Sequence, residues 1–244
     1  MNHPLTAHRP VTKALYVVIT SDKGLAGALN SSVLRAAAAD ITSLGLSPNS
    51  VSIIAIGRKA HDFFIARGFT IDLYHLNVDD IQEALTPELV GIAADRFSRG
   101  KIDLVKIVYQ NFVSTFEQRP TLRTMFPLSL EELQKVVDDI IPARGAFSDS
   151  SYRGVASVNS YTVEPNEEDV LNAILPRLAS IFVYHALLET KASEHSARMV
   201  SMKSASDKAE ELTHAFTLQF NKARQAAITR EVSEITGGME AMAN

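Results

Sequence analysis

The sequence feature that most constrains the fold is a stretch of 60 residues, 177–236, that contains neither glycine nor proline. The chain has 244 residues with 11 glycines and 9 prolines, so a stretch of this length would hold about five of them at the average frequency. Both residue types interrupt helices, glycine through its backbone freedom and proline through its missing N–H. The stretch therefore predicts a single long α-helix.

Signals for both helix ends flank this stretch. Asn166 can cap the amino end, and acidic residues at 167–169 follow in the first turn, where the helix dipole favours negative charge. Pro176 is expected to kink the helix or to shift its effective start towards the carboxyl end. The pair Gly237-Gly238 is expected to end the helix, because glycine readily adopts the left-handed conformation of a C-cap.

Such a helix is too long to be covered by its own domain. Sixty helical residues span about 90 Å, whereas the remaining residues, folded compactly, have a radius of gyration of about 16 Å. A narrow, mostly apolar seam with alternating spacings of three and four residues is typical of packing against a second helix, as in a coiled coil. The seam consists of Leu178, Ile181, His185, Leu188, Ala192, His195, Met199, Met202, Ser206, Ala209, Thr213, Phe216, Phe220, Ala223 and Ala227. No second long helix is evident, so the partner is expected to be another chain or a segment that this sequence lacks.

The first half of the chain has a different pattern, in which strand-like runs alternate with helical segments. Strands are predicted at 14–20, 51–56, 70–76, 103–112 and 121–126, the last at an edge, with helices at 26–44, 58–67 and 87–99. This alternation predicts an α/β fold, a Rossmann-like layered domain with a largely parallel sheet. A segment rich in Ser, Gly, Ala and Arg at 142–160 is interpreted as a linker. We therefore expect an α/β domain over 1–160 and a strand end followed by the long helix over 161–244.

Composition excludes several classes of site and partner. The chain has no cysteine, so thiolate nucleophiles, disulfides and iron–sulfur clusters are excluded. The formal net charge of -4 argues against a nucleic-acid binder, which needs a basic surface. Purely apolar runs are strand-sized, and no direct membrane span is expected.

Two motifs are candidates for a ligand site. The loop at 21–27 follows the first strand and precedes a helix, a place where α/β folds often hold phosphate, but the glycine-rich phosphate motifs are absent and a tight turn is favoured. His185 and His195 fall on the seam without the ligand set that a metal needs, so packed and hydrogen-bonded histidines are favoured. No catalytic residue, cofactor or metal is predicted.

Three motifs carry a specific resemblance to a known family. Residues 20–30 (TSDKGLAGALN) resemble the T-S-D-[RK]-G-L-x-G-x-x-N signature of the gamma subunit of F-type ATP synthases. Residues 193–203 (SEHSARMVSMK) are similar to its S-E-x-x-A-R-M-x-A-M stretch, and residues 218–238 (LQFNKARQAAITREVSEITGG) to its carboxyl-terminal motif. The resemblance runs in the right order from about residue 3 to residue 238.

The resemblance implies a rotor subunit without a catalytic group of its own. In this family a Rossmann-like domain sits on the membrane c-ring with the epsilon subunit, and a long helix pairs with an amino-terminal helix inside the hexamer of α and β subunits (α3β3). Rotation driven by ion flow then changes the nucleotide affinity of each β subunit in turn. The implied location is the cytoplasmic face of a bacterial plasma membrane. Motif matching implies contacts with the α and β subunits at Arg198, Arg224, Gln225, Thr229 and Glu231.

The sequence departs from the family pattern at three places. The amino-terminal helix with its T-x-K-I-T-x-A-M motif is absent, and a truncation or a mis-set start is the expected explanation. Ala26 stands where the family often has cysteine, and Asp207 stands where asparagine is usual. The absence of cysteine excludes the thiol-regulated chloroplast variety and favours a bacterial protein.

Two alternatives to the rotor role remain open from the sequence. One is a small α/β enzyme that binds a nucleotide or phosphorylated ligand at the loop 21–27. The other is a scaffold that self-associates through the seam.

Overall fold

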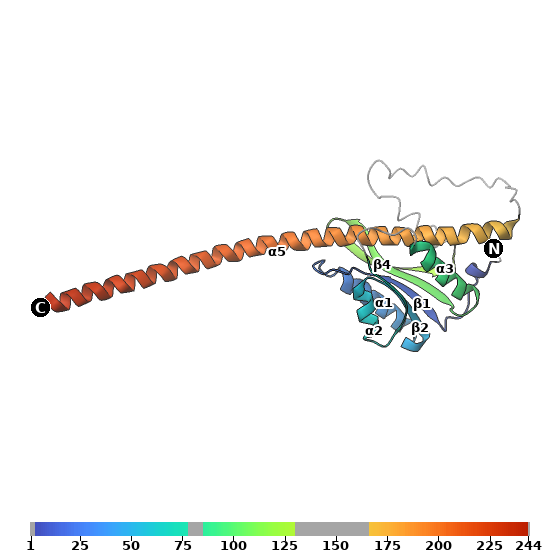
Figure 1. The fold of residues 1–244 in the computed structure, drawn as a ribbon, viewed down its shortest axis with the longest axis horizontal. Coiled ribbons are helices and arrows are strands. Elements are labelled where there is room, and N and C mark those ends of the chain that lie inside the picture. The colour runs from blue at the N-terminus through green and yellow to red at the C-terminus, as the bar shows by residue number, and fades with distance from the viewer. Residues whose placement is uncertain (1–2, 78–84, 130–165, 244) are drawn as a thin grey trace, which may run out of the picture. The chain divides into compact units, whose positions relative to one another are not determined.

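The computed structural model describes residues 3–77, 85–129 and 166–243 (Figure 1). The chain consists of two parts, an α/β part over residues 1–198 and a carboxyl-terminal part over residues 199–244. The predicted linker at 142–160 and the predicted domain boundary at 160 lie outside the described residues. They therefore stay predictions.

The α/β part contains a five-stranded sheet with the strand order β3-β2-β1-β4-β5. Its strands are β1 (Ala14–Ile19), β2 (Val51–Ile56), β3 (Thr70–His75), β4 (Leu104–Ser114) and β5 (Glu117–Phe126). The first four are mutually parallel, and only β5 runs antiparallel, as the second arm of a hairpin with β4. Because β5 is an edge strand, it can contain Pro120 without losing an inner ladder hydrogen bond. The predicted α/β class and the largely parallel sheet are confirmed.

Helices cover both faces of the sheet (Figure 1). The connecting helices are α1 (Leu29–Ser43), α2 (Arg58–Ile65) and α3 (Leu85–Ser98), with short 3-10 turns at Pro4–Thr6 and Pro48–Ser50. Alternate residues of β1 point to opposite faces, so that one set packs against α1 and α2 and the other against α3 and α5. All six residues of β1 are buried, as expected for the central strand of a three-layer fold.

The long helix, α5 (Glu167–Ala243), is the largest element of the chain, with 77 residues. The Asp169 amide donates to Asn166 Oδ1 at 2.8 Å, which confirms the predicted amino-terminal cap. The helix begins before Pro176 and contains it, so the proline does not delay the helix start.

The predicted end of the helix at Gly237-Gly238 is wrong, because α5 continues through both glycines to Ala243. Neither glycine has the positive φ of a C-cap. A glycine lowers helix propensity by about 1 kcal/mol without forcing a turn, so the motif is compatible with a helix that ends near the chain terminus.

Two different faces of α5 are apolar within the α/β part. The face that packs on the sheet consists of Leu175, Ala179, Phe182, Val183, Ala186 and Leu187, all buried. The predicted seam is another face, on which Ile181 is 59% exposed and Leu188 is 43% exposed. His195, expected to be packed, is exposed in this chain. Most of the seam within the α/β part is therefore exposed, whereas Leu178 and His185 are half-buried.

Candidate functional site

The five residues implied as subunit contacts fall in both parts of the chain. Arg224, Gln225, Thr229 and Glu231 lie on the carboxyl-terminal part of α5, and all four are exposed. At 100° per residue, Arg224 and Glu231 share one face of the helix, and Gln225 and Thr229 share the neighbouring face. Arg198 is the last residue of the α/β part. The four exposed residues present two charges and two hydrogen-bonding groups, which suits contact with polar groups of another subunit.

The structure places Arg198 in an ion cluster with two other residues of α5. Arg198 Nη2 donates to Glu194 Oε1 at 2.5 Å, and Lys191 Nζ lies 3.5 Å from Glu194 Oε2. The Glu194 side chain is only 3% exposed. A carboxylate buried to this extent needs nearby cations, so Arg198 stabilises the helix internally, whatever contact it makes with another subunit.

A set of buried polar residues on α5 was not predicted from the sequence. The set, here called the polar junction, consists of Thr190, Lys191, Ser193, Glu194 and Ser196, each at most 9% exposed. It continues the face that is apolar as far as Leu187. Hydroxyl residues at 190, 193 and 196 on this face are the one signal in the sequence that could have indicated it.

The polar junction bonds to several segments of the α/β part. The backbone N–H of Gln110 donates to Thr190 Oγ1, and Ser193 Oγ donates to the backbone carbonyl of Gln110, each at 3.3 Å. Ser196 Oγ donates to the carbonyl of Thr115 at 2.8 Å. The side chains of α5 thus hydrogen-bond directly to the backbone of β4 and of the β4–β5 hairpin.

Lys191 reaches the carboxyl end of the parallel strands. Its Nζ donates to the Asn77 carbonyl at 2.9 Å, and Asn77 Nδ2 donates to the Thr20 carbonyl, which follows β1, at 2.6 Å. In open α/β sheets this edge is where ligands usually bind. Here it is in contact with the protein's own helix.

A titratable cluster joins α5 to the edge of the sheet. Asn111 Nδ2 donates to Glu189 Oε2 at 3.1 Å, and His185 Nδ1 lies 3.6 Å from Glu189 Oε1. Burial raises the pKa of Glu189 from 4.5 to about 7, against the opposing effects of Arg123, Tyr109 and Asn111. Burial, followed by the charge of Arg123, lowers the pKa of His185. The Glu189 side chain is only 13% exposed, so its protonation state affects the packing of α5 on the sheet.

The loop at 21–27 uses its polar groups within the fold. The Ser21 amide donates to Asn30 Oδ1 at 2.9 Å, and Asp22 Oδ1 accepts from the Arg58 amide at the start of α2 at 2.6 Å. Thr20 Oγ1 accepts from another amide in the first turn of that helix, at Ala60, at 2.9 Å. A phosphate bound at this helix start would have to replace these contacts. Leu25 and Gly27 have positive φ, as in the tight turn that the sequence favours.

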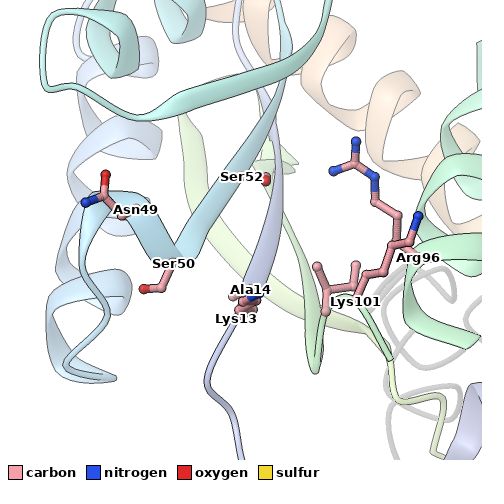
Figure 2. A pocket seen from close by; sticks show the side chains of 8 residues that line it. Lys13, Ala14, Asn49, Ser50, Ser52, Arg96 and Lys101 are labelled. Carbon is pink, nitrogen blue, oxygen red and sulfur yellow. The ribbon is translucent and has the colours of Figure 1, made fainter. Parts of the chain in front are cut away.

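A cavity of about 320 Å³ lies at the amino ends of β1 and β2 (Figure 2). Asn49 and Ser50 line one side, and Arg96 and Lys101 line the other. The Arg96 guanidinium is already paired with Asp72. The residues that line the cavity include no carboxylate, no histidine and no nucleophile paired with a base. The cavity lies at the amino ends of the parallel strands, opposite to the end where ligands usually bind.

The described residues offer no evident metal site, and one of their helices is long and apolar. No group of three or more histidine and acidic residues is placed to hold a metal ion among the described residues. By length and composition α5 could cross a membrane, but 33% of its most apolar window is buried within the protein, as in a helix that packs on a sheet. The expectation that no segment spans the membrane stays a prediction.

Comparison with known proteins decides the family. The model of the family described as ATP synthase matches residues 1–242. The chain is 39% identical to the ATP synthase gamma chain of Staphylococcus haemolyticus and 37% identical to that of Staphylococcus carnosus. Each match extends over 242 residues, which are 99% of this chain and 78% of the relative. The chain belongs to the ATP synthase gamma chain family.

Solved structures agree with the fold of this gamma family member. A chain of the Euglena gracilis mitochondrial ATP synthase, in a structure of OSCP, F1 and the c-ring, matches with a TM-score of 0.66 at 21% identity. The match covers 98% of this chain and 78% of that one. A chain of the Tetrahymena thermophila central stalk and c-ring matches with a TM-score of 0.59 at 21% identity, over 82% and 80% of the two chains. The family model and the two relatives confirm the resemblance stated from the three motifs, and the solved structures agree with the fold.

Proposed function

We propose that this chain is the central-stalk rotor subunit of an F-type ATP synthase, in which it couples rotation of the c-ring to conformational change in the catalytic β subunits. Membership of the gamma chain family supports the role. The observation that carries it is the exposed course of α5 after Arg198, where apolar residues such as Phe216, Phe220 and Ile235 are each more than 60% exposed. A helix with such a surface requires other chains around it.

The partners that this role requires are an α3β3 hexamer around the exposed helix, with an epsilon subunit and a c-ring at the α/β part. The position that follows is peripheral, on the cytoplasmic face of a bacterial plasma membrane. No catalytic group is proposed for this chain, because the family to which it belongs is named as a chain of the ATP synthase complex. Its contribution to ATP synthesis is mechanical.

The proposed stator contacts are Arg224, Gln225, Thr229 and Glu231 on the exposed helix, together with Arg198. Guanidinium and amide groups on an exposed helix can bond carboxylates and carbonyls across an interface. Arg198 differs from the others, because its replacement would also leave Glu194 with one cation fewer. Its test therefore needs a stability measurement alongside activity.

The role is tested by replacing the gamma chain of a bacterial ATP synthase with this chain and measuring ATP-driven proton pumping in inverted membrane vesicles. Pumping above the level of vesicles without any gamma chain is the expected result. The variant R224A/Q225A should pump less, whereas R35A, an exposed arginine on α1, is the matched control. Failure of the unaltered chain to enter the complex would refute the proposed function. A concentration-dependent homodimer under the same conditions would favour the scaffold alternative.

A further inference from the structure

The polar junction is concentrated at one point of the fold. The described residues include ten buried polar or charged side chains, and five of them lie on α5 between Thr190 and Ser196. Burial of polar groups is unfavourable unless each finds a partner. Hydrophobic packing alone would have served to attach the helix, as it does from Leu175 to Leu187. The chain therefore changes from apolar to polar contacts in the last turns before the carboxyl-terminal part.

The strand that receives these contacts has an open edge at the same place. The pairing of β1 with β4 ends at Val108, so that β4 lacks a neighbour on that side at Gln110. The backbone N–H and C=O of one strand residue point to the same side, and those of Gln110 bond to the side chains of Thr190 and Ser193 of α5. The helix thus takes the place of a missing strand.

Hydrogen bonds constrain the helix in a way that apolar packing does not. Hydrophobic contact is non-directional, so apolar packing alone fixes the rotation of a helix less strictly than directional bonds do. A hydrogen bond weakens steeply when its geometry changes. The side chains of α5 bond to Gln110, Thr115 and Asn77, which lie in different segments of the α/β part. A rotation of α5 about its own axis would therefore break all of these bonds together.

We propose that the hydroxyls of Thr190, Ser193 and Ser196 and the ammonium of Lys191 lock the rotational position of α5 on the sheet, so that a twist applied to the α/β part is passed to the helix without slip. This inference rests on the proposed rotor function. The residues are positioning residues, since they touch neither nucleotide nor ion. Their role is to keep the sheet and the helix in one register while torque passes between them.

The test compares two triple variants in the assembled ATP synthase. T190V/S193A/S196A removes three hydroxyls of the junction and retains most of the side-chain volume. S31A/T42V/S43A removes the same groups from α1, where each hydroxyl bonds only to a carbonyl of its own helix or its cap. Protons pumped per ATP hydrolysed are measured for both. We expect normal hydrolysis but a lower pumping ratio in the junction variant, and no change of that ratio in the control.

A second measurement is specific to the geometry. The Gln110 amide donates to Thr190 Oγ1, so T190V should speed its hydrogen exchange about fivefold, the factor that one hydrogen bond typically contributes. T190S retains the hydroxyl and should restore both slow exchange and the pumping ratio.

The outcomes separate the inference from the function on which it rests. If the unaltered chain does not pump, the proposed function fails and the inference fails with it. If the unaltered chain pumps and the junction variant has the same ratio, only the inference is wrong. A parallel loss of hydrolysis and pumping would mean that the residues serve folding alone, which also overturns it. If the triple variant does not assemble, the single variants T190V and S193A provide the same comparison.

Discussion

Replacing Glu189 by glutamine should make the α/β part less sensitive to pH. Glu189 lies on α5 and contacts Asn111 of β4. Burial raises its pKa from 4.5 to about 7. An acid whose pKa is higher in the folded state binds more protons when folded. The raised pKa of Glu189 favours folding most below about pH 4.5, and this contribution to stability is lost as the pH rises through about 7.

The size of the effect follows from the shift. A difference of about 2.5 pKa units corresponds to about 3 kcal/mol at 1.36 kcal/mol per unit. The side chain keeps 13% of its surface in water, which screens part of this, so we expect E189Q to gain about 2 kcal/mol over wild type at pH 8. At pH 5 the difference should fall below about 1 kcal/mol, because the carboxyl group is then largely protonated in the folded state and only half a pH unit above its pKa of 4.5 in the unfolded chain. Glutamine can still accept the hydrogen bond from Asn111.

The assay is urea unfolding of the full chain between pH 5 and pH 8, followed by tyrosine fluorescence. His185 has the opposite pH dependence, since its lowered pKa makes the fold less stable as the pH falls below about 6.5. Because Glu189 lies 3.6 Å from His185 Nδ1, the two proteins are compared at pH 8, where the lowered pKa of His185 leaves the imidazole neutral. E210Q, on the exposed part of α5, should have the pH profile of wild type. Equal unfolding free energies for wild type and E189Q at pH 8 would refute the reasoning.

Three further substitutions test the fold at other points. G57A should destabilise the α/β part by at least about 3 kcal/mol, because Gly57 has a φ of 93° and a Cβ there would lie 2.1 Å from the Thr20 carbonyl oxygen; a near-native thermal midpoint would be inconsistent with this packing. D40A should cost about 3 kcal/mol by leaving Lys106, which contacts both Asp40 oxygens at 2.8 Å, without that partner; a neutral result in urea unfolding would show that the pair is not needed. N166A should cost about 1 kcal/mol by removal of the helix cap, seen as faster hydrogen exchange in the first turn of α5, and unchanged exchange there would contradict the cap.

Much of the secondary structure could be predicted because it depends on local pattern. The strands at 14–20 and 51–56 are runs of β-branched and apolar residues that end at a turn, and β1 and β2 agree with them to within one residue. The long helix followed from the absence of glycine and proline, but its end did not. A glycine pair signals a helix end only where the backbone turns, and at Gly237-Gly238 it does not.

The sequence motifs sufficed for the family but not for the role of each residue in it. Arg198 could be singled out from its motif, yet its bond to Glu194 joins two residues of one helix whose burial depends on the packing of that helix. The Glu189 cluster brings together residues 78 positions apart at its contact with Asn111. Such a meeting depends on where α5 crosses the sheet.

The sequence by itself determined which segments are helices and strands, that the chain contains a helix too long to be sheltered by its own domain, and which family it resembles. These properties depend on residues near one another in the chain. Only the tertiary structure decided which face of α5 meets the sheet, because α5 has two apolar faces and composition does not choose between them. It also decided that the open edge of β4 at Gln110 is closed by hydroxyls of α5, since a backbone group without a strand partner must find whatever donor or acceptor the fold brings to it.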